Sequence, residues 1–149
     1  MRSMRVEADP KRCLGCLACE VACVGAHSPS DRHPRLLVSS GIDDASKKKR
    51  YSVSVVPRRF PAICRQCDEP LCVTVCKTGA LSKDRSGVVM LDSEKCSGCS
   101  ICQKVCQFGG IRVDRSLGLA FKCDLCAETG DPACVKACQV QALELVTEG

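Results

Sequence analysis

The sequence predicts an α+β fold built from short helices, short antiparallel hairpins and much loop. Cysteines spaced four apart recur along the chain, as at Cys102 and Cys106, and such pairs lie on one face of a single helical turn. Short runs rich in Val, Ile and Leu are bounded by turn residues, which is typical of short strands. Aromatic residues make up only 3% of the 149 residues and Trp is absent, so no large conventional core is expected.

The expected elements follow one another along the chain. Helices of little more than one turn are expected around Cys19 to Cys23 and around the three equivalent cysteine pairs. Strands 35–38 and 51–56 would form an antiparallel hairpin across a polar loop. The further strand candidates are 87–91, 111–114 and 118–122, and "DRSLG" is typical of a turn between the last two.

Sixteen cysteines fall into four quartets, and no cysteine is left over. The quartets are Cys13, Cys16, Cys19 and Cys23; Cys64, Cys67, Cys72 and Cys76; Cys96, Cys99, Cys102 and Cys106; and Cys123, Cys126, Cys134 and Cys138. The third has the spacing C-x2-C-x2-C-x3-C, by which bacterial proteins hold [4Fe-4S] clusters. Three cysteines of a tight loop can bind three corners of one cubane while backbone N–H groups point at their sulfurs, and the fourth reaches a neighbouring cluster. We therefore expect four [4Fe-4S] clusters held by paired quartets.

Disulfides and zinc are the alternatives to iron–sulfur clusters. The N-terminus has no apolar signal segment and no stretch is long enough to cross a bilayer, so we expect a cytoplasmic protein with reduced thiols. Zinc sites also use C-x2-C pairs, but they usually join two such pairs across a longer loop. A zinc-stapled interaction module therefore stays open as a less favoured alternative. His27 and His33 are expected at the surface, because each cluster already has four cysteines.

The segments that follow the quartets also share features. Leu81, Ile111 and Leu143 each lie five positions after the last cysteine of a quartet, where they could cover a cluster from water. The bacterial run usually continues with proline, but that position is never proline here: it holds Val24, Lys77, Gln107 and Gln139. We hypothesise that the added N–H groups raise cluster potentials, with drift at a tolerant position as the alternative.

The formal net charge of +5 would become negative if clusters bind. Each oxidised cluster with four thiolates carries about −2, so four clusters would bring the chain to about −3. The excess Lys and Arg would then compensate cluster charge. No nucleic-acid partner is expected, because no aromatic residues interleave with the basic ones. The run "KKKR" at 47–50 is expected to be a solvated loop, or alternatively a docking site for an acidic partner.

The motifs "CLGCLACEVAC", "CRQCDEPLC" and "KCDLCAETGDPACVKAC" resemble a known family over nearly the whole chain. This family comprises the four-cluster, ferredoxin-like electron-transfer subunits of anaerobic oxidoreductases. The chain looks closest to the short branch that serves carbon monoxide dehydrogenase, hydrogenase, formate dehydrogenase or formate hydrogenlyase, and tungsten aldehyde oxidoreductase. The electron-transfer subunits of dimethyl sulfoxide reductase and nitrate reductase are longer relatives.

The resemblance implies that the outer two quartets pair and that the inner two pair. An inner ferredoxin-like module, 64–106, would be inserted into an outer one, 1–63 plus 107–149, with two clusters in each. The implied ligand sets are Cys13, Cys16, Cys19 and Cys138; Cys123, Cys126, Cys134 and Cys23; Cys64, Cys67, Cys72 and Cys106; and Cys96, Cys99, Cys102 and Cys76. Spacing alone also allows sequential pairing, although the 19-residue gap between Cys76 and Cys96 independently favours the inner pair.

The sequence shows no sign of a catalytic site. All irons would be bound by four thiolates per cluster, and neither a Gly-rich nucleotide loop nor a catalytic triad is present. We therefore expect an electron-transfer subunit of an anaerobic metalloenzyme complex. It would connect the catalytic subunit to a second redox partner of the flavoprotein, ferredoxin or hydrogenase type, and copies could self-associate into longer wires. A freestanding polyferredoxin is the alternative.

Overall fold

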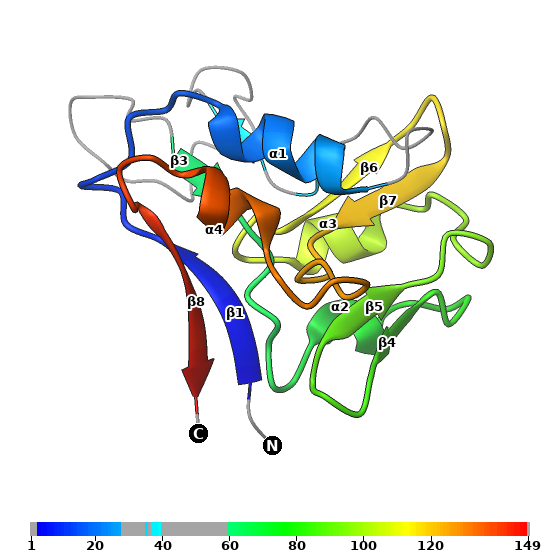
Figure 1. Ribbon diagram of the computed structural model, residues 1–149. Helices are drawn as coiled ribbons and strands as arrows, with labels where there is room; N and C mark the ends of the chain where they lie inside the picture. Colours follow the sequence, from blue (N-terminus) through cyan, green and yellow to red (C-terminus); the bar gives the residue numbers. More distant parts are fainter. Residues whose placement is uncertain (1–2, 28–34, 36, 40–59, 149) are drawn as a thin grey trace.

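The computed structural model describes residues 3–27, 35, 37–39 and 60–148, and it shows an α+β architecture (Figure 1). The helices in this part of the chain are α1 (Ala18–Ala26), α2 (Leu71–Thr74), α3 (Ile101–Val105) and α4 (Ala133–Ala137). Each begins just before the third cysteine of a quartet, as the spacing predicts. None of the helices described is long and apolar enough to cross a membrane.

The strands pair into separate two-stranded antiparallel sheets. The pairs are β1 (Ser3–Ala8) with β8 (Leu143–Glu148), β2 (Leu37–Ser39) with β3 (Phe60–Ala62), β4 (Leu81–Lys83) with β5 (Val89–Leu91), and β6 (Ile111–Asp114) with β7 (Leu119–Lys122). Each sheet has two edges and too little apolar surface to be stable alone. The sheets therefore serve to position the cysteine loops.

Several strands agree with the sequence prediction and others do not. The 111–114 and 118–122 candidates form the β6–β7 hairpin, and 87–91 contains β5. The 35–38 candidate overlaps β2, but β2 pairs with β3, which was not predicted; the expected partner 51–56 lies outside the described residues, as does the basic run 47–50. Strands β1, β4 and β8 were not predicted from the sequence. β4 has only three residues, whereas β1 and β8 have six each and pair across the two ends of the described chain.

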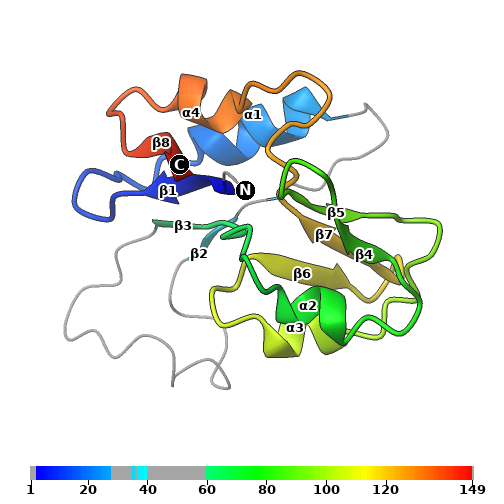
Figure 2. The same cartoon turned by 90° about the horizontal axis from the view of Figure 1, so that it is seen from below.

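Segments far apart in the sequence lie side by side. The β1–β8 pair joins the two ends of the described chain, and α1 packs beside α4, so the first and fourth quartets are neighbours. Helices α2 and α3 pack together in the same way and bring the second and third quartets together. Figure 2 shows α1, α4, β1 and β8 on one side of the molecule, and α2, α3 and β4–β7 on the other.

Two small cores correspond to these two sides. The outer core contains Val6, Ile63, Val88, Leu125 and Leu143 together with Cys19, Cys23, Cys123 and Cys134. The inner core contains Leu81, Val89, Ile111 and Ala120 together with Cys102. Leu81, Ile111 and Leu143 are only 3–4% exposed, which confirms their predicted burial beside the cysteines. Cysteine side chains thus form a large part of the interior.

Candidate iron–sulfur sites

The same backbone turn occurs in all four quartets. The residue before the second cysteine has a positive φ in each case, at Gly15, Gln66, Gly98 and Leu125. In the first and fourth quartets the N–H of this residue donates to the sulfur of the first cysteine, at 3.4 Å from Gly15 N to Cys13 Sγ and 3.3 Å from Leu125 N to Cys123 Sγ. The turn therefore points backbone donors at the sulfurs, as the spacing predicts.

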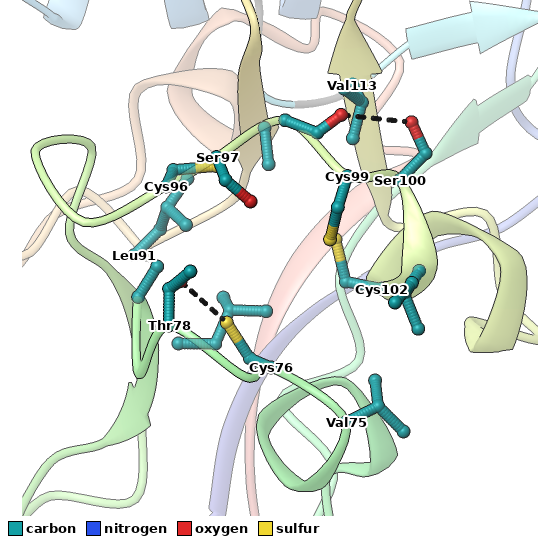
Figure 3. Close-up of a pocket in the computed structure, with 15 residues that line it drawn as sticks. Val75, Cys76, Thr78, Leu91, Cys96, Ser97, Cys99, Ser100, Cys102 and Val113 are labelled. Atoms are coloured by element: carbon teal, nitrogen blue, oxygen red, sulfur yellow. Dashed lines mark hydrogen bonds between the residues drawn. The ribbon is translucent and has the colours of Figure 1, made fainter.

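One cavity lies between the second and third quartets (Figure 3). We call it the Cys96 cavity; four cysteines line it, namely Cys76, Cys96, Cys99 and Cys102. About 350 Å³ of its volume is free of atoms and partly open to solvent. The remaining lining is largely apolar, including Val75, Leu81, Leu91, Ile101 and Val113. Four soft thiol donors in an apolar setting fit an iron–sulfur cluster.

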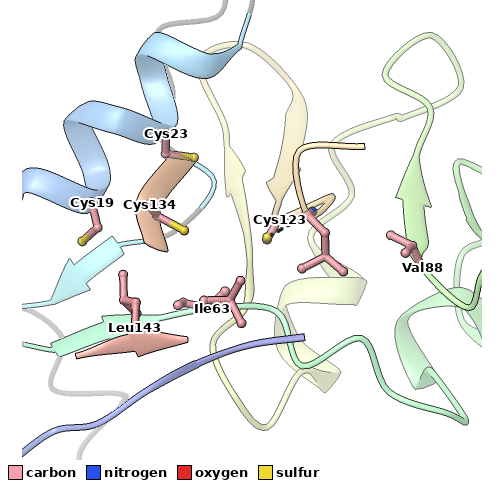
Figure 4. Close-up of a cluster of buried hydrophobic side chains, with 9 residues drawn as sticks. Cys19, Cys23, Ile63, Val88, Cys123, Cys134 and Leu143 are labelled. Carbon is pink, nitrogen blue, oxygen red and sulfur yellow. Dashed lines mark hydrogen bonds between the residues drawn. The ribbon is translucent and has the colours of Figure 1, made fainter. Parts of the chain in front are cut away.

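A second cavity lies between the first and fourth quartets. We call it the Cys123 cavity; its cysteines are Cys23, Cys123, Cys126 and Cys134, and its free volume is about 290 Å³. Figure 4 shows Cys23 on α1 beside Cys134 on α4, with Cys123 approaching from the loop after β7. This cavity differs from the first because His27, Arg35 and Asp124 also line it.

The thiols ring each cavity instead of converging on one point. Within the described ranges, no three His, Cys, Asp or Glu side chains are placed to hold a single metal ion. A cubane presents four separate iron atoms, so its ligands do not need to converge in that way. The donor sets of both cavities are therefore compatible with a cluster.

Several of the other eight predicted ligands are also brought near one another. The Cys67 and Cys72 thiols both have a pKa raised first by burial and then by the nearby sulfurs of Cys64 and Cys106. Cys19 likewise lies close enough to Cys13 for their thiols to interact. Cys138 packs against the outer core that contains Cys19. Its sulfur accepts a hydrogen bond from the N–H of Ala142 at 3.2 Å.

Burial has a strong effect on the free thiols. It raises the pKa of Cys19 and Cys102 to about 11 and the pKa of Cys123 and Cys134 to about 12. Burial also acts on Cys76, but hydrogen bonds from Thr78 and from neighbouring backbone N–H groups outweigh it and lower the Cys76 pKa. The buried thiols hold their protons at neutral pH, so iron binding must displace them.

His27 is not a surface residue, contrary to the sequence prediction. Its side chain is 10% exposed, with Nδ1 2.6 Å from the carbonyl oxygen of Cys23 and Nε2 3.3 Å from Asp124 Oδ1. The helix α1 extends two turns past Cys19 and carries His27 over the Cys123 cavity. His33 lies outside the described residues.

Sequence reasoning also missed two residues beside Cys23. The backbone N–H of Arg35 donates to Cys23 Sγ at 3.2 Å, and Arg35 Nη1 lies 3.5 Å from Asp124 Oδ2. Asp124 thus lies between Arg35 and His27. Its place inside the C-x2-C pair of the fourth quartet was the only available signal.

Gly110 is a further missed residue, and it supports the second quartet. A Cβ atom at this position would lie 2.5 Å from the Cα of Cys64 and 2.7 Å from its nitrogen. Real Cβ atoms do not approach backbone so closely, so only glycine allows the segment after Cys106 to pass the start of the second quartet.

Comparison with known proteins identifies the family to which the chain belongs. The family model described as a 4Fe-4S dicluster domain matches residues 55–148, which include three of the four quartets. The chain belongs to the 4Fe-4S dicluster domain family. This confirms the resemblance inferred from the cysteine motifs and the prediction of an iron–sulfur electron-transfer protein.

Two relatives of this chain are named as electron-transfer proteins, and a third is named as a dehydrogenase subunit. It is 34% identical to the thiosulfate reductase electron transfer subunit PhsB of Salmonella typhi, covering 91% of this chain and 71% of the relative. It is also 34% identical to the electron transport protein HydN of Escherichia coli, covering 91% and 83%. The NADH-dependent phenylglyoxylate dehydrogenase subunit beta of Aromatoleum evansii is 39% identical over 93% of this chain, which spans only 29% of that subunit.

Proposed function

We propose that the chain binds four [4Fe-4S] clusters and conducts electrons between a catalytic metalloenzyme subunit and a second redox partner. A bound cluster exchanges one electron at a potential that its protein surroundings set. The observation that carries this proposal is that each of two cavities is ringed by four thiols from two different quartets. The names of the relatives support the role as a subunit.

We propose the nested ligand sets that the resemblance implies. The lining of the two cavities supports two of them: Cys76 with the first three cysteines of the third quartet, and Cys23 with those of the fourth. The packing of α1 on α4 and of α2 on α3 supports the same pairing. We also keep the two-module division at 64–106, noting that the β6–β7 hairpin packs its apolar residues on the inner core.

Contacts between ligand sets support a linear order of clusters. Cys19 of the first set lies close to Cys134 of the Cys123 set. Cys123 in turn lies close to Cys64. Cys72, in the same set as Cys64, lies close to Cys102 of the Cys96 cavity. Cysteines of successive ligand sets thus lie close to one another, which supports short electron-transfer steps between the proposed clusters.

The exposed cysteines support electron exchange at the two ends of this order. Cys16 and Cys99 are the only exposed cysteines, and all sixteen lie in the described part of the chain. They belong to the first and last ligand sets. A partner that docks at either end approaches an exposed proposed ligand, whereas every cysteine of the two middle sets is buried or only partly exposed.

Iron and sulfide analysis tests the proposal. Chain purified without oxygen should contain about sixteen iron and sixteen acid-labile sulfide and show EPR signals of reduced [4Fe-4S] clusters. Zinc in place of iron would support the zinc-stapled module instead. Isolation from the native host then tests the partner: elution of the chain alone at 16.0 kDa would favour a freestanding polyferredoxin.

The absence of a catalytic site and a cytoplasmic location remain proposals. Both rest on the sequence: four cysteines per cluster leave no iron open to substrate, and many reduced thiols suit a reducing compartment. Turnover of any substrate by the fully loaded chain alone would contradict the first.

A further inference from the structure

Two polar side chains are buried at the seam between the inner and outer cores. Gln66 and Lys122 are each 1% exposed, and they are the only buried polar or charged residues in the part of the chain that the structure describes. Val89 of the inner core and Cys123 of the outer core lie on either side of them. The seam is thus where the Cys123 ligand set meets the set that contains Cys64 and Cys72.

Gln66 and Lys122 bond to the same two residues. The Lys122 ammonium donates to the carbonyl oxygens of Val89 and Cys123. Gln66 Nε2 donates to the same Cys123 carbonyl at 2.9 Å, and Gln66 Oε1 accepts from the N–H of Val89 at 2.8 Å. The neutral amide of Gln66 therefore already links the two cores, and linking alone does not account for a buried cation.

The position of Lys122 explains why a charged side chain is buried here. No ion pair within the described ranges includes Lys122, so no carboxylate compensates its charge there. Lys122 bonds to the carbonyl of Cys123 and acts electrostatically on the thiols of Cys72 and Cys123, which would become thiolates on metal binding. These two cysteines belong to different ligand sets. An unpaired buried cation is costly unless negative charge lies nearby, and two bound clusters would supply it.

We propose that Lys122 raises the reduction potentials of the two middle clusters and so favours electrons at the junction of the two modules. This inference rests on the proposed function. Each reduction adds a negative charge, and a cation buried beside the ligands of both clusters stabilises that charge with little screening by water. Lys122 is buried and is not a proposed cluster ligand, so it acts as a tuning residue.

Redox titration of three variants, followed by EPR on the fully loaded chain, tests the proposal. Lys122→Met removes the charge and should lower two of the four midpoint potentials while leaving the other two unchanged. Lys122→Arg keeps the charge and should titrate close to wild type. Gln66→Met removes the neutral link but keeps the cation, and it should shift the potentials much less than Lys122→Met.

A second charge variant covers the case in which Lys122→Met loads iron poorly. Gln66→Glu keeps Lys122 and places a carboxylate beside it, so the same two potentials should fall. Unchanged potentials in fully loaded Lys122→Met, or equal shifts in Lys122→Met and Gln66→Met, would overturn the proposal. The proposal would also be overturned if Lys122→Met and Gln66→Glu both lost iron while Gln66→Met stayed fully loaded. Failure of the proposed function would instead appear as low iron in the wild-type chain.

Discussion

The Cys96 and Cys123 cavities are built from the same motif but have different surroundings. Both are lined by four thiols from two quartets. The Cys96 cavity has mostly apolar walls and an exposed cysteine, Cys99, whereas three of the four cysteines of the Cys123 cavity are buried and its wall includes the charged pair of Arg35 and Asp124. The comparison teaches that the motif specifies ligands, while its neighbours specify access and charge.

Differences in the quartets themselves explain part of this contrast. The third quartet is compact, and Gly98 lets its loop lie against the backbone of Gly118. The fourth quartet has a spacer of seven residues, in which the N–H groups of Thr129 and Gly130 donate to the carbonyl oxygen of Cys126. This longer loop contributes Pro132 to the wall of the Cys123 cavity.

The largest expected difference between the cavities is in ligand removal. Cys123→Ala removes a buried ligand that also packs in the outer core, so anaerobic melting should occur more than about 10 °C lower. Cys99→Ala removes an exposed ligand at the end of the proposed order and should lower the melting temperature much less, with iron lost from one cluster. Equal losses of stability would contradict the contrast between a buried middle site and an exposed end site.

The next effect concerns the loop of the Cys96 cavity. A Cβ atom on Gly98 would lie 2.6 Å from the carbonyl carbon of Gly118, so Gly98→Ala should displace the loop and reduce iron per chain by about a quarter. Gly118→Ala is the matched control, because Gly118 also has a positive φ but its Cβ would meet nothing within 4 Å. That control should cost only about 1 kcal/mol of unfolding free energy. Similar iron loss in both variants would show that φ strain, not the close contact, is responsible.

A smaller effect should separate the electrostatics of the two cavities. Asp124→Asn removes a carboxylate that is only 16% exposed, so one midpoint potential should rise, because reduction no longer meets that negative charge. The shift is expected to be on the order of tens of mV. Asp92→Asn makes the same charge change on the exposed surface near Cys96 and should shift no potential measurably, because water and salt screen it. EPR-monitored titrations of both variants check this; a larger shift in Asp92→Asn would reverse the comparison.

The smallest effect is at the β1–β8 pair, which joins the two ends of the described chain. Arg5 on β1 pairs with Glu148 on β8 at 2.6 Å and with Glu7 at 2.7 Å, and these carboxylates raise its pKa further above the ordinary value. Arg5→Gln should lower the unfolding free energy by up to about 1 kcal/mol, and less at high salt. Lys95→Gln breaks an exposed pair with Asp92 in the loop after β5 and should have almost no effect. A larger cost for Lys95→Gln in salt-dependent unfolding would contradict this ranking.

Local sequence patterns were sufficient for many of these features. The helical turns at the C-x3-C pairs, the β6–β7 hairpin and the buried Leu81, Ile111 and Leu143 depend on nearest neighbours and on strong local periodicity. The segment "SMRVEA" alternates polar and apolar residues, which is a local strand signal, but its pairing with β8 depends on contact between the two ends of the described chain, and nothing local predicts that partner. His27 was misplaced because α1 continues past Cys23 and turns the ring toward Asp124.

The iron–sulfur electron-transfer role could be predicted from the sequence, because the type and spacing of the cysteines are local properties of the chain, and the family match confirms it. The sequence also determined the short helices, since i and i+4 cysteines share a helical face. Only the tertiary structure decided which groups surround each set of thiols. Gln66 donates to the carbonyl oxygen of Cys123, 57 residues away, and Arg35 pairs with Asp124, 89 residues away. Lys122 directly precedes Cys123 in the chain, but only packing brings its ammonium to the carbonyl oxygen of Val89. Charge and burial act through space, so they cannot be deduced from spacing along the chain.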